Sequence, residues 1–181
     1  GQLEELVAAG DVEVIAMAEY QQWFQTLPAG FRASVIETWG EPEEADIMAM
    51  EVDGVLSLVL PIIRFNNVVV MPQPDRARMQ NLDALYQSQE LPPHHQYVAA
   101  YLWLQRQFQA DAIVHTGTHG THEWMSGKEA GLAGEDPGEV LAGDLAIIYP
   151  YIVDDVGEGI VAKRRGMSTV VDHLTPALGE G

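Results

Sequence analysis

Apolar side chains recur at helical spacing in four parts of the chain. Residues 11–27 place them three and four positions apart, between an aspartate that suits an N-cap and a proline that stops a helix. A second helix is predicted over 29–39 and a third over 92–108, where prolines fit the first turn and an apolar stripe is formed by Tyr97, Tyr101, Leu104 and Phe108. A closing helix is predicted over about 157–174, with these apolar side chains inward: Ile160, Val161, Met167, Val170, Val171 and Leu174.

Short apolar runs between these segments predict strands. They are rich in β-branched residues and cover 56–61, 68–71, 112–115 and 146–153. Strands that alternate with helices favour an α/β fold, with a mixed or parallel sheet flanked by helices and a helical N-terminal part. We interpret 1–181 as one α/β segment. Its first 55 residues are acidic and mainly helical, and the strand–helix–strand remainder carries a histidine-rich loop and a basic helix.

Composition narrows the classes of protein that the chain can represent. Of its 181 residues, 47% are hydrophobic and 20% are charged, which is typical of a soluble globular protein. The sequence contains no apolar run near the roughly 20 residues that a membrane span requires, and no leader pattern at its start. The absence of cysteine excludes disulfides and thiolate metal sites, and fits a cytoplasmic protein. The net charge of −18 argues against a nucleic-acid partner.

The loop that follows the predicted strand at 112–115 concentrates coordinating side chains. His115, His119, His122 and Glu123 lie within nine positions, among glycines and threonines. Imidazole and carboxylate are common ligands of divalent transition metals, and they accept protons near neutral pH. In open α/β sheets, ligands bind at the carboxyl ends of strands. The spacing therefore predicts a metal-handling or proton-accepting loop, with a hydrogen-bonded core histidine as the alternative for His115.

Several known catalytic motifs are absent from this loop. Position 126 is serine, so the loop lacks the His-Glu-x-x-His pattern of helical zinc proteases. Residues 122 and 129 are His and Glu where a phosphate-binding P-loop requires Gly and Ser or Thr. The sequence also lacks a Gly-x-Ser-x-Gly nucleophile motif. ATP binding by this chain through a P-loop is therefore not supported.

Two further groups of polar residues remain open to a structural or a functional interpretation. His94 and His95 follow two prolines, and because adjacent helical residues point about 100° apart, at most one of them can face a shared site. Helix capping is the structural alternative for this pair. Glu158 and the basic run 163–165 can present charges to a polycarboxylate or a cation, although a carboxylate at the start of a helix also stabilises the helix dipole.

Several segments form an ordered set of motifs along the chain. They are Pro92-Pro-His-His-Gln-Tyr97, Asp111-Ala-Ile-Val-His115-x-Gly-Thr-His119-Gly-Thr-x-Glu123-Trp124-x-x-Gly127-Lys128, Gly143-Asp-Leu-x-x-x-Tyr149-Pro-Tyr-Ile-Val-Asp154, Gly157-Glu158-Gly-x-x-Ala-Lys163-Arg164-Arg165 and Asp172-His173-Leu-Thr-Pro176. This set resembles the large subunit of cobaltochelatase, the CobN type, in a family that also contains the large subunit of magnesium chelatase. The upstream segments Trp39-Gly40 and Arg64-Phe65-x-Asn67-Val68 with Gln73-Pro74 also resemble this family, so the match covers most of the chain. Because subunits of this family are several times longer than 181 residues, we expect an internal segment of a larger subunit.

The resemblance implies insertion of Co²⁺ or Mg²⁺ into a tetrapyrrole, with the divalent metal as substrate. It also implies two partner subunits, one of them an AAA+ ATPase that hydrolyses the ATP. Thr118 resembles the magnesium branch of the family, whereas the motif at 149–154 resembles the cobalt branch.

The resemblance also assigns roles to individual residues. Catalysis is assigned to His119 and Glu123, supported by His115. The metal ligands that we expect are His115, His119, His122 and Glu123, of which His122 departs from the family's pattern and would tighten the metal site. Substrate binding is assigned to His95, Lys128, Lys163 and Arg164, the last three as partners of macrocycle carboxylates.

Two other classes of function stay open on the residues alone. A stand-alone metal-dependent hydrolase would use the same histidines and Glu123, and would bind metal tightly and turn over substrate without partners. A non-catalytic docking module would use the acidic half to recruit other subunits, through contacts that are sensitive to salt.

Overall fold

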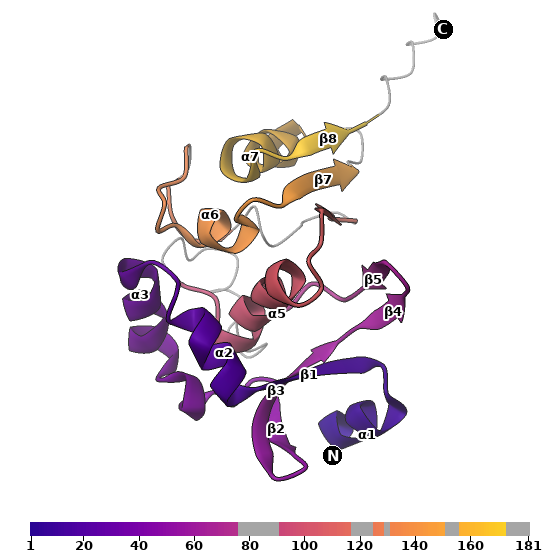
Figure 1. Ribbon diagram of the computed structural model, residues 1–181. Helices are drawn as coiled ribbons and strands as arrows, with labels where there is room; N and C mark the ends of the chain where they lie inside the picture. Colours follow the sequence, from indigo (N-terminus) through magenta and orange to yellow (C-terminus); the bar gives the residue numbers. More distant parts are fainter. Residues whose placement is uncertain (76–90, 117–124, 129–130, 151–155, 173–181) are drawn as a thin grey trace, which may run out of the picture.

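The computed structural model describes residues 1–75, 91–116, 125–128, 131–150 and 156–172, which form an α/β structure with three small sheets (Figure 1). The N-terminal half contains α1 (Gln2–Ala9), β1 (Val12–Ala16), α2 (Met17–Phe24), α3 (Ala29–Trp39), the 3₁₀ helix η1 (Pro42–Glu44), β2 (Ala49–Val52), β3 (Val55–Pro61), β4 (Ile63–Phe65) and β5 (Val68–Val70). The second half contains α5 (His95–Arg106), β6 (Ala112–Val114), α6 (Pro137–Ala142), β7 (Ala146–Pro150), α7 (Val156–Gly166) and β8 (Thr169–Val171).

The first sheet has the order β1-β3-β2 and is antiparallel throughout. The predicted helix over 11–27 is wrong in its first part, because residues 12–16 pair with β3 and only 17–24 are helical. Ile15 is fully buried in this strand, opposite Leu58. β-branched side chains at 12, 14 and 15 favour the extended conformation, and the pairing with β3 overrides the helical spacing.

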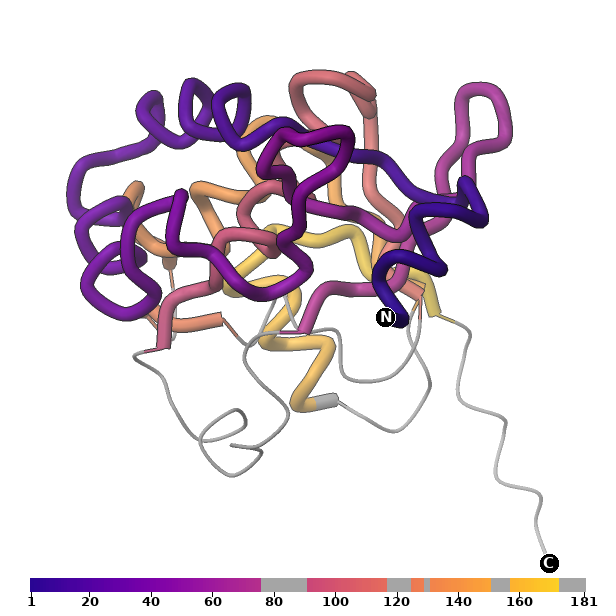
Figure 2. Tube along the Cα trace, turned by 90° about the horizontal axis from the view of Figure 1, so that it is seen from below, coloured from indigo at the N-terminus to yellow at the C-terminus, as the bar shows by residue number. Residues whose placement is uncertain are grey.

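The second sheet is a hairpin of β4 and β5, which projects from one end of the molecule (Figure 2). Its two-residue turn begins with Asn66 at φ 56°, a left-handed conformation that asparagine adopts more readily than most residues. The register pairs Arg64 with Val69, and these two side chains therefore share one face of the hairpin. Val69 packs against the core on this face, so the other face points outward.

The third sheet is parallel, with the order β6-β7-β8. The predicted closing helix is wrong beyond residue 166, because 169–171 form strand β8 instead. Met167, expected to face inward, is 88% exposed at φ 47° between the helix and the strand, and Ile160 is also exposed. The β-branched residues 169–171 pair with β7, and this pairing replaces the last turns of the predicted helix.

Helix α5 lies in the centre of the molecule, with α2 and β3 on one side and α6 on the other (Figure 1). Every residue from His95 to Leu104 is buried, so the predicted apolar stripe is only part of a helix that is covered on all sides. The helices predicted over 29–39 and 92–108 and the strands at 56–61, 68–71, 112–115 and 146–153 are confirmed as α3, α5, β3, β5, β6 and β7, each within a few residues where described. None of the helices in the described ranges is long and apolar enough to cross a membrane.

Strand β3 provides a matched test of where the core lies. Val59 is fully buried and Val55 is 50% exposed, and both belong to this strand. We expect Val59→Ala to lower the free energy of unfolding by about 2 kcal/mol, because two buried methyl groups are lost and a cavity remains. We expect Val55→Ala to change it by less than about 0.5 kcal/mol. Urea unfolding of both variants measures the difference, and equal losses would contradict this description of the core.

Candidate functional site

The three strands of the parallel sheet end at one edge. This carboxyl edge is where the sequence predicts a ligand site. His115 follows the last residue of β6, and its backbone N–H donates to the carbonyl of Ile148 in β7 over 2.9 Å. His119, His122 and Glu123 lie outside the described residues, so their predicted roles stay predictions. Within the described residues, no group of three histidines or carboxylates is arranged to hold a metal ion.

The His115 side chain is half-buried and belongs to a hydrogen-bonded chain of polar groups. Its Nε2 lies 3.3 Å from the hydroxyl of Tyr101. The Gln73 amide contacts that hydroxyl through both Nε2 and Oε1, at 3.1 and 3.2 Å, and also donates to the hydroxyl of Tyr97 over 2.7 Å. The two tyrosine rings stack, with centroids 5.2 Å apart. Tyr101 and Gln73 therefore orient His115, in the way that neighbouring side chains orient ligating or catalytic histidines.

Sequence reasoning missed this network. Tyr97 and Tyr101 were assigned to the apolar stripe of the helix, and their one-turn spacing is the only signal that they would meet. Gln73 comes from a segment far away in sequence, so no local pattern indicates its contact with the two hydroxyls.

A groove of about 570 Å³ opens beside this network. Its walls come from β5 with its flanking residues from Asn67 to Pro74, from Tyr101 and Leu104 of α5 with Phe108 just beyond it, and from residues 110 and 112–116. The side chains of Gln73, Tyr101 and His115 line the groove, and most other lining residues are apolar. None of the described lining residues is Asp, Glu, Lys or Arg, in a chain whose net charge is −18.

His94 and His95 are both only 2% exposed, at the N-terminus of α5. Nδ1 of His94 accepts from the backbone N–H of Tyr97, which makes His94 the N-cap of the helix, so Nε2 carries the hydrogen and donates to the carbonyl of Asp75 over 2.6 Å. His95 donates from Nε2 to the carbonyl of Gly40 over 3.0 Å, and its Nδ1 lies 2.8 Å from the hydroxyl of Tyr20.

The capping alternative is therefore correct for His94. The described contacts of His95 favour a structural role, since both ring nitrogens are engaged within the protein, and its assignment to substrate binding stays a prediction.

Burial keeps both histidines neutral. It lowers the pKa of His94 to about 4, against a smaller raising effect of the Asp75 carbonyl. It also lowers the pKa of His95, partly offset by the Gly40 carbonyl and by nearby glutamates. An uncharged imidazole needs one donor and one acceptor as partners, and each ring has both among its neighbours.

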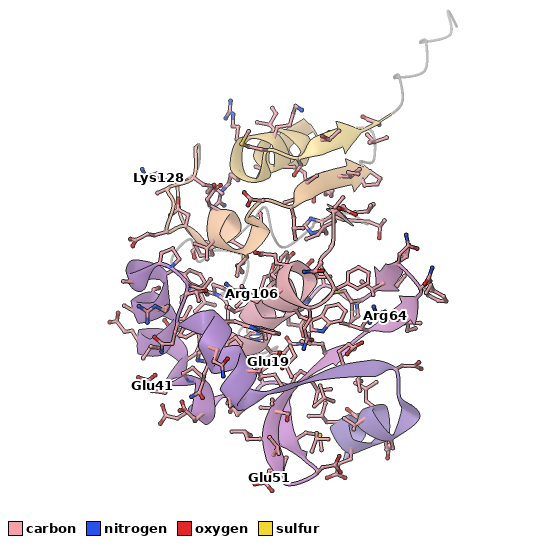
Figure 3. All side chains as sticks on the ribbon, in the orientation of Figure 1. Glu19, Glu41, Glu51, Arg64, Arg106 and Lys128 are labelled. Carbon is pink, nitrogen blue, oxygen red and sulfur yellow. The ribbon has the colours of Figure 1, made fainter. Side chains whose placement is uncertain are left out.

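The basic residues predicted to hold macrocycle carboxylates lie at the surface. Lys128, Lys163 and Arg164 are exposed, and Lys128 lies at an outer corner of the molecule (Figure 3). Asp136 accepts from the backbone N–H groups of Lys128 and Ala133, and so holds the Gly-Lys turn against the start of α6. Gly127 in this turn has φ 110°, and a Cβ there would lie 2.6 Å from Cγ of Asp136, which explains the glycine.

Glu158, in the first turn of α7, is 2% exposed and accepts a hydrogen bond from the hydroxyl of Tyr149 over 2.7 Å. This contact joins α7 to β7 beneath the carboxyl edge of the sheet. Arg165, the third residue of the basic run, donates to the carbonyl of Ser126 and is only partly exposed. The three basic residues 163–165 therefore differ in their surroundings. Lys163 and Arg164 face solvent, whereas Arg165 is hydrogen-bonded to the segment that follows the histidine-rich loop.

Comparison with known protein families gives a match that extends over nearly the whole chain. The family model described as CobN/Magnesium Chelatase matches residues 2–181 of this chain. The chain belongs to this family, and the resemblance seen in its motifs is confirmed.

Individual relatives sharpen this assignment. The chain is 44% identical over 168 residues to the aerobic cobaltochelatase subunit CobN of a Sinorhizobium species, which covers 92% of this chain and 13% of the relative. It is 39% identical over 116 residues to the H subunit of magnesium chelatase from Chlorobaculum parvum, covering 64% of this chain and 9% of that protein. The solved structure of the catalytic subunit of cobaltochelatase from Mycobacterium tuberculosis superposes with a TM-score of 0.80 at 39% identity, over 91% of this chain and 14% of that one. The chain thus spans a small part of the length of each of these proteins.

The lowered histidine pKa values make stability sensitive to acid. An unfolded histidine binds a proton below about pH 6.5, whereas folded His94 does so only near pH 4. The free energy of unfolding is therefore highest above about pH 6.5 and falls as the pH drops from there towards 4.

We expect His94→Asn to keep a helix cap but to weaken this pH dependence, because asparagine does not titrate. It should also lose about 1–3 kcal/mol at pH 7.5, where the bond to Asp75 is missing. Urea unfolding at pH 7.5, 6.0 and 5.0 measures both effects, and an unchanged slope with pH would show that folding does not lower the pKa of His94.

Proposed function

We propose that this chain forms part of the catalytic large subunit of an ATP-dependent metal chelatase, which inserts a divalent metal into a tetrapyrrole in cobalamin or chlorophyll-type biosynthesis. The observation that carries the proposal is the match of a CobN/magnesium chelatase family model to residues 2–181. The histidine-rich segment begins at the carboxyl edge of a parallel sheet, beside an uncharged groove, which supports placing the chemistry there.

Metal insertion requires three chemical events. Two pyrrole N–H protons must leave, the metal ion must lose its water, and the flat ring must distort. Imidazoles and carboxylates in a partly dry site suit the first two events, because their pKa values respond strongly to burial and to nearby charges. We assign proton removal and metal transfer to His119 and Glu123, with His115 in support and His122 as an additional metal ligand. The Tyr101–Gln73 network supports this role of His115 by fixing the orientation of its ring.

Cobalt is the metal that we propose for this chain, with magnesium as the alternative. The match to the Sinorhizobium cobaltochelatase subunit extends over 92% of the chain, whereas the match to the Chlorobaculum magnesium-chelatase subunit covers 64% at lower identity. The motif at 149–154 also resembles the cobalt branch. The ion is a substrate in this proposal, and it need not remain bound between turnovers.

ATP hydrolysis is assigned to partner subunits. The sequence of this chain contains no P-loop, so the energy for dehydrating the metal and distorting the ring has to come from elsewhere in the complex. We propose an AAA+ ATPase subunit and a third subunit as partners, in the cytoplasm. The acidic N-terminal half offers a surface for such contacts, and these would weaken as salt is added.

A chimera tests the proposed function directly. The corresponding segment of the Sinorhizobium CobN subunit is replaced by this chain, and cobalt insertion is measured with the two partner subunits and ATP. We expect the chimera to insert cobalt, and expect His119→Ala in the chimera to lower the rate by about 10²-fold or more, as loss of a proton-transfer group does.

The control is Glu139→Gln, at an exposed carboxylate on α6 outside the acidic half, which should leave the rate unchanged. An assembled chimera with no insertion of cobalt or magnesium would refute the proposed function. Equal rates with and without His119 would remove that residue from the mechanism.

A further inference from the structure

The uncharged groove between β5 and β6 has a cationic side chain directly beside it. Arg64 lies over the ring of Phe108, with its guanidinium carbon 5.4 Å from the ring centre, and Phe108 lines the groove. In the hairpin, Arg64 is also the register partner of Val69, another lining residue on the same face. The contact with Phe108 and the shared face with Val69 therefore place this guanidinium at the margin of the groove.

Arg64 is also available for a ligand. Its side chain is 57% exposed, and its described ion pair is with Glu13 at 4.0 Å, which is the limit of such a contact. An exposed pair of this length contributes little free energy, so the guanidinium can turn to a new carboxylate at small cost. The contact with the face of the Phe108 ring holds the planar guanidinium in place, and this contact uses none of its N–H donors.

The charges of the chain make this position unusual. The protein carries 27 acidic and 9 basic residues, and an anionic ligand is repelled by most of such a surface. The groove is free of acidic residues among its described lining, and the hairpin and the segment that follows it, from Ile62 to Pro74, contain one charged residue, Arg64. A ligand that is apolar in the middle and anionic at its edge fits this combination.

We infer that this groove seats the ring of a planar macrocycle that bears peripheral carboxylates, and that Arg64 binds one of those carboxylates. The inference rests on the proposed function and adds to it a location on this chain and a role for Arg64, to which the sequence motifs assign none. The volume of about 570 Å³ lies within the range of small-molecule sites, and an open groove of this size takes one side of a tetrapyrrole. Tyr101, Gln73 and His115 then supply the polar contacts at its wall.

Binding of deuteroporphyrin IX, which has two propionates, tests the inference on the chain as it is. Quenching of tryptophan fluorescence reports the binding, since Trp103 stacks on Phe108 at the groove. Ala112 is exposed on the edge strand β6 and lines the groove, so Ala112→Phe fills the groove without entering the core. Ala18→Phe, at an exposed position on α2 outside the groove, is the matched control.

We expect Ala112→Phe to weaken binding about tenfold and Ala18→Phe to leave it unchanged. Circular dichroism verifies that each variant folds. If Ala112→Phe does not fold, Thr116→Phe repeats the test at an exposed lining position outside the strand.

The carboxylate contact is tested separately. We expect Arg64→Gln to weaken the binding of deuteroporphyrin about two- to fivefold, and to leave the binding of its dimethyl ester unchanged in the same dilute detergent. Arg106→Gln removes an exposed cation whose guanidinium donates to the hydroxyl of Thr26 and which does not line the groove, and it should affect neither ligand.

Each other outcome overturns a specific part of the inference. Equal binding by wild type and both groove-filling variants would show that the ring binds elsewhere, and would leave the proposed function in place. Equal losses for the acid and the ester in Arg64→Gln would remove the carboxylate contact. Absence of porphyrin binding to the wild-type chain would overturn the groove as a seat, while the chimera assay decides the proposed function independently.

Discussion

The hydrogen bonds of His94 and His95 determine where the central helix sits. Both side chains are buried at the first turn of α5, and together they reach three separate parts of the chain: the carbonyl of Asp75, the carbonyl of Gly40 and the hydroxyl of Tyr20. α5 contacts the first sheet through β3 and the second half of the chain through α6. Its position therefore determines where Tyr101 meets His115, and where one wall of the groove lies. A change of partner at either histidine affects all of these contacts.

Local sequence patterns predicted helices α3 and α5 and strands β3, β5, β6 and β7, whose own residues carry a clear helical or β-branched pattern. α3 ends at Gly40 as expected, because a glycine at φ 80° stops a helix irrespective of its surroundings. β1 and β8 were predicted as helical, because apolar residues at spacings of three and four also occur where a strand joins a helix, as at 12–24 and 156–171. Only pairing with β3 and β7 distinguishes these strands, and pairing partners are remote in sequence.

The candidate site was likewise predictable from local sequence only in part. The carboxyl edge that carries His115 followed from the strand assignment at 112–115, which needed only local residues. Tyr101, Gln73 and Arg64 precede His115 by 14, 42 and 51 positions, and no local pattern brings them together with it beside one groove. The chemistry of a site can be recognised from a cluster of coordinating residues in the sequence. The side chains that orient those residues, or that bind the charges of a ligand, come together only through tertiary contacts.

The contrast between an uncharged groove and a strongly acidic chain has a consequence for the two substrates of the proposed reaction. A field of net negative charge raises the local concentration of divalent cations and lowers that of polycarboxylates. The metal ion is therefore drawn to the protein at long range, while the macrocycle gains its attraction only at short range, at the groove and the guanidinium of Arg64. Added salt screens the long-range field, so ionic strength slows the encounter with one substrate and speeds the encounter with the other.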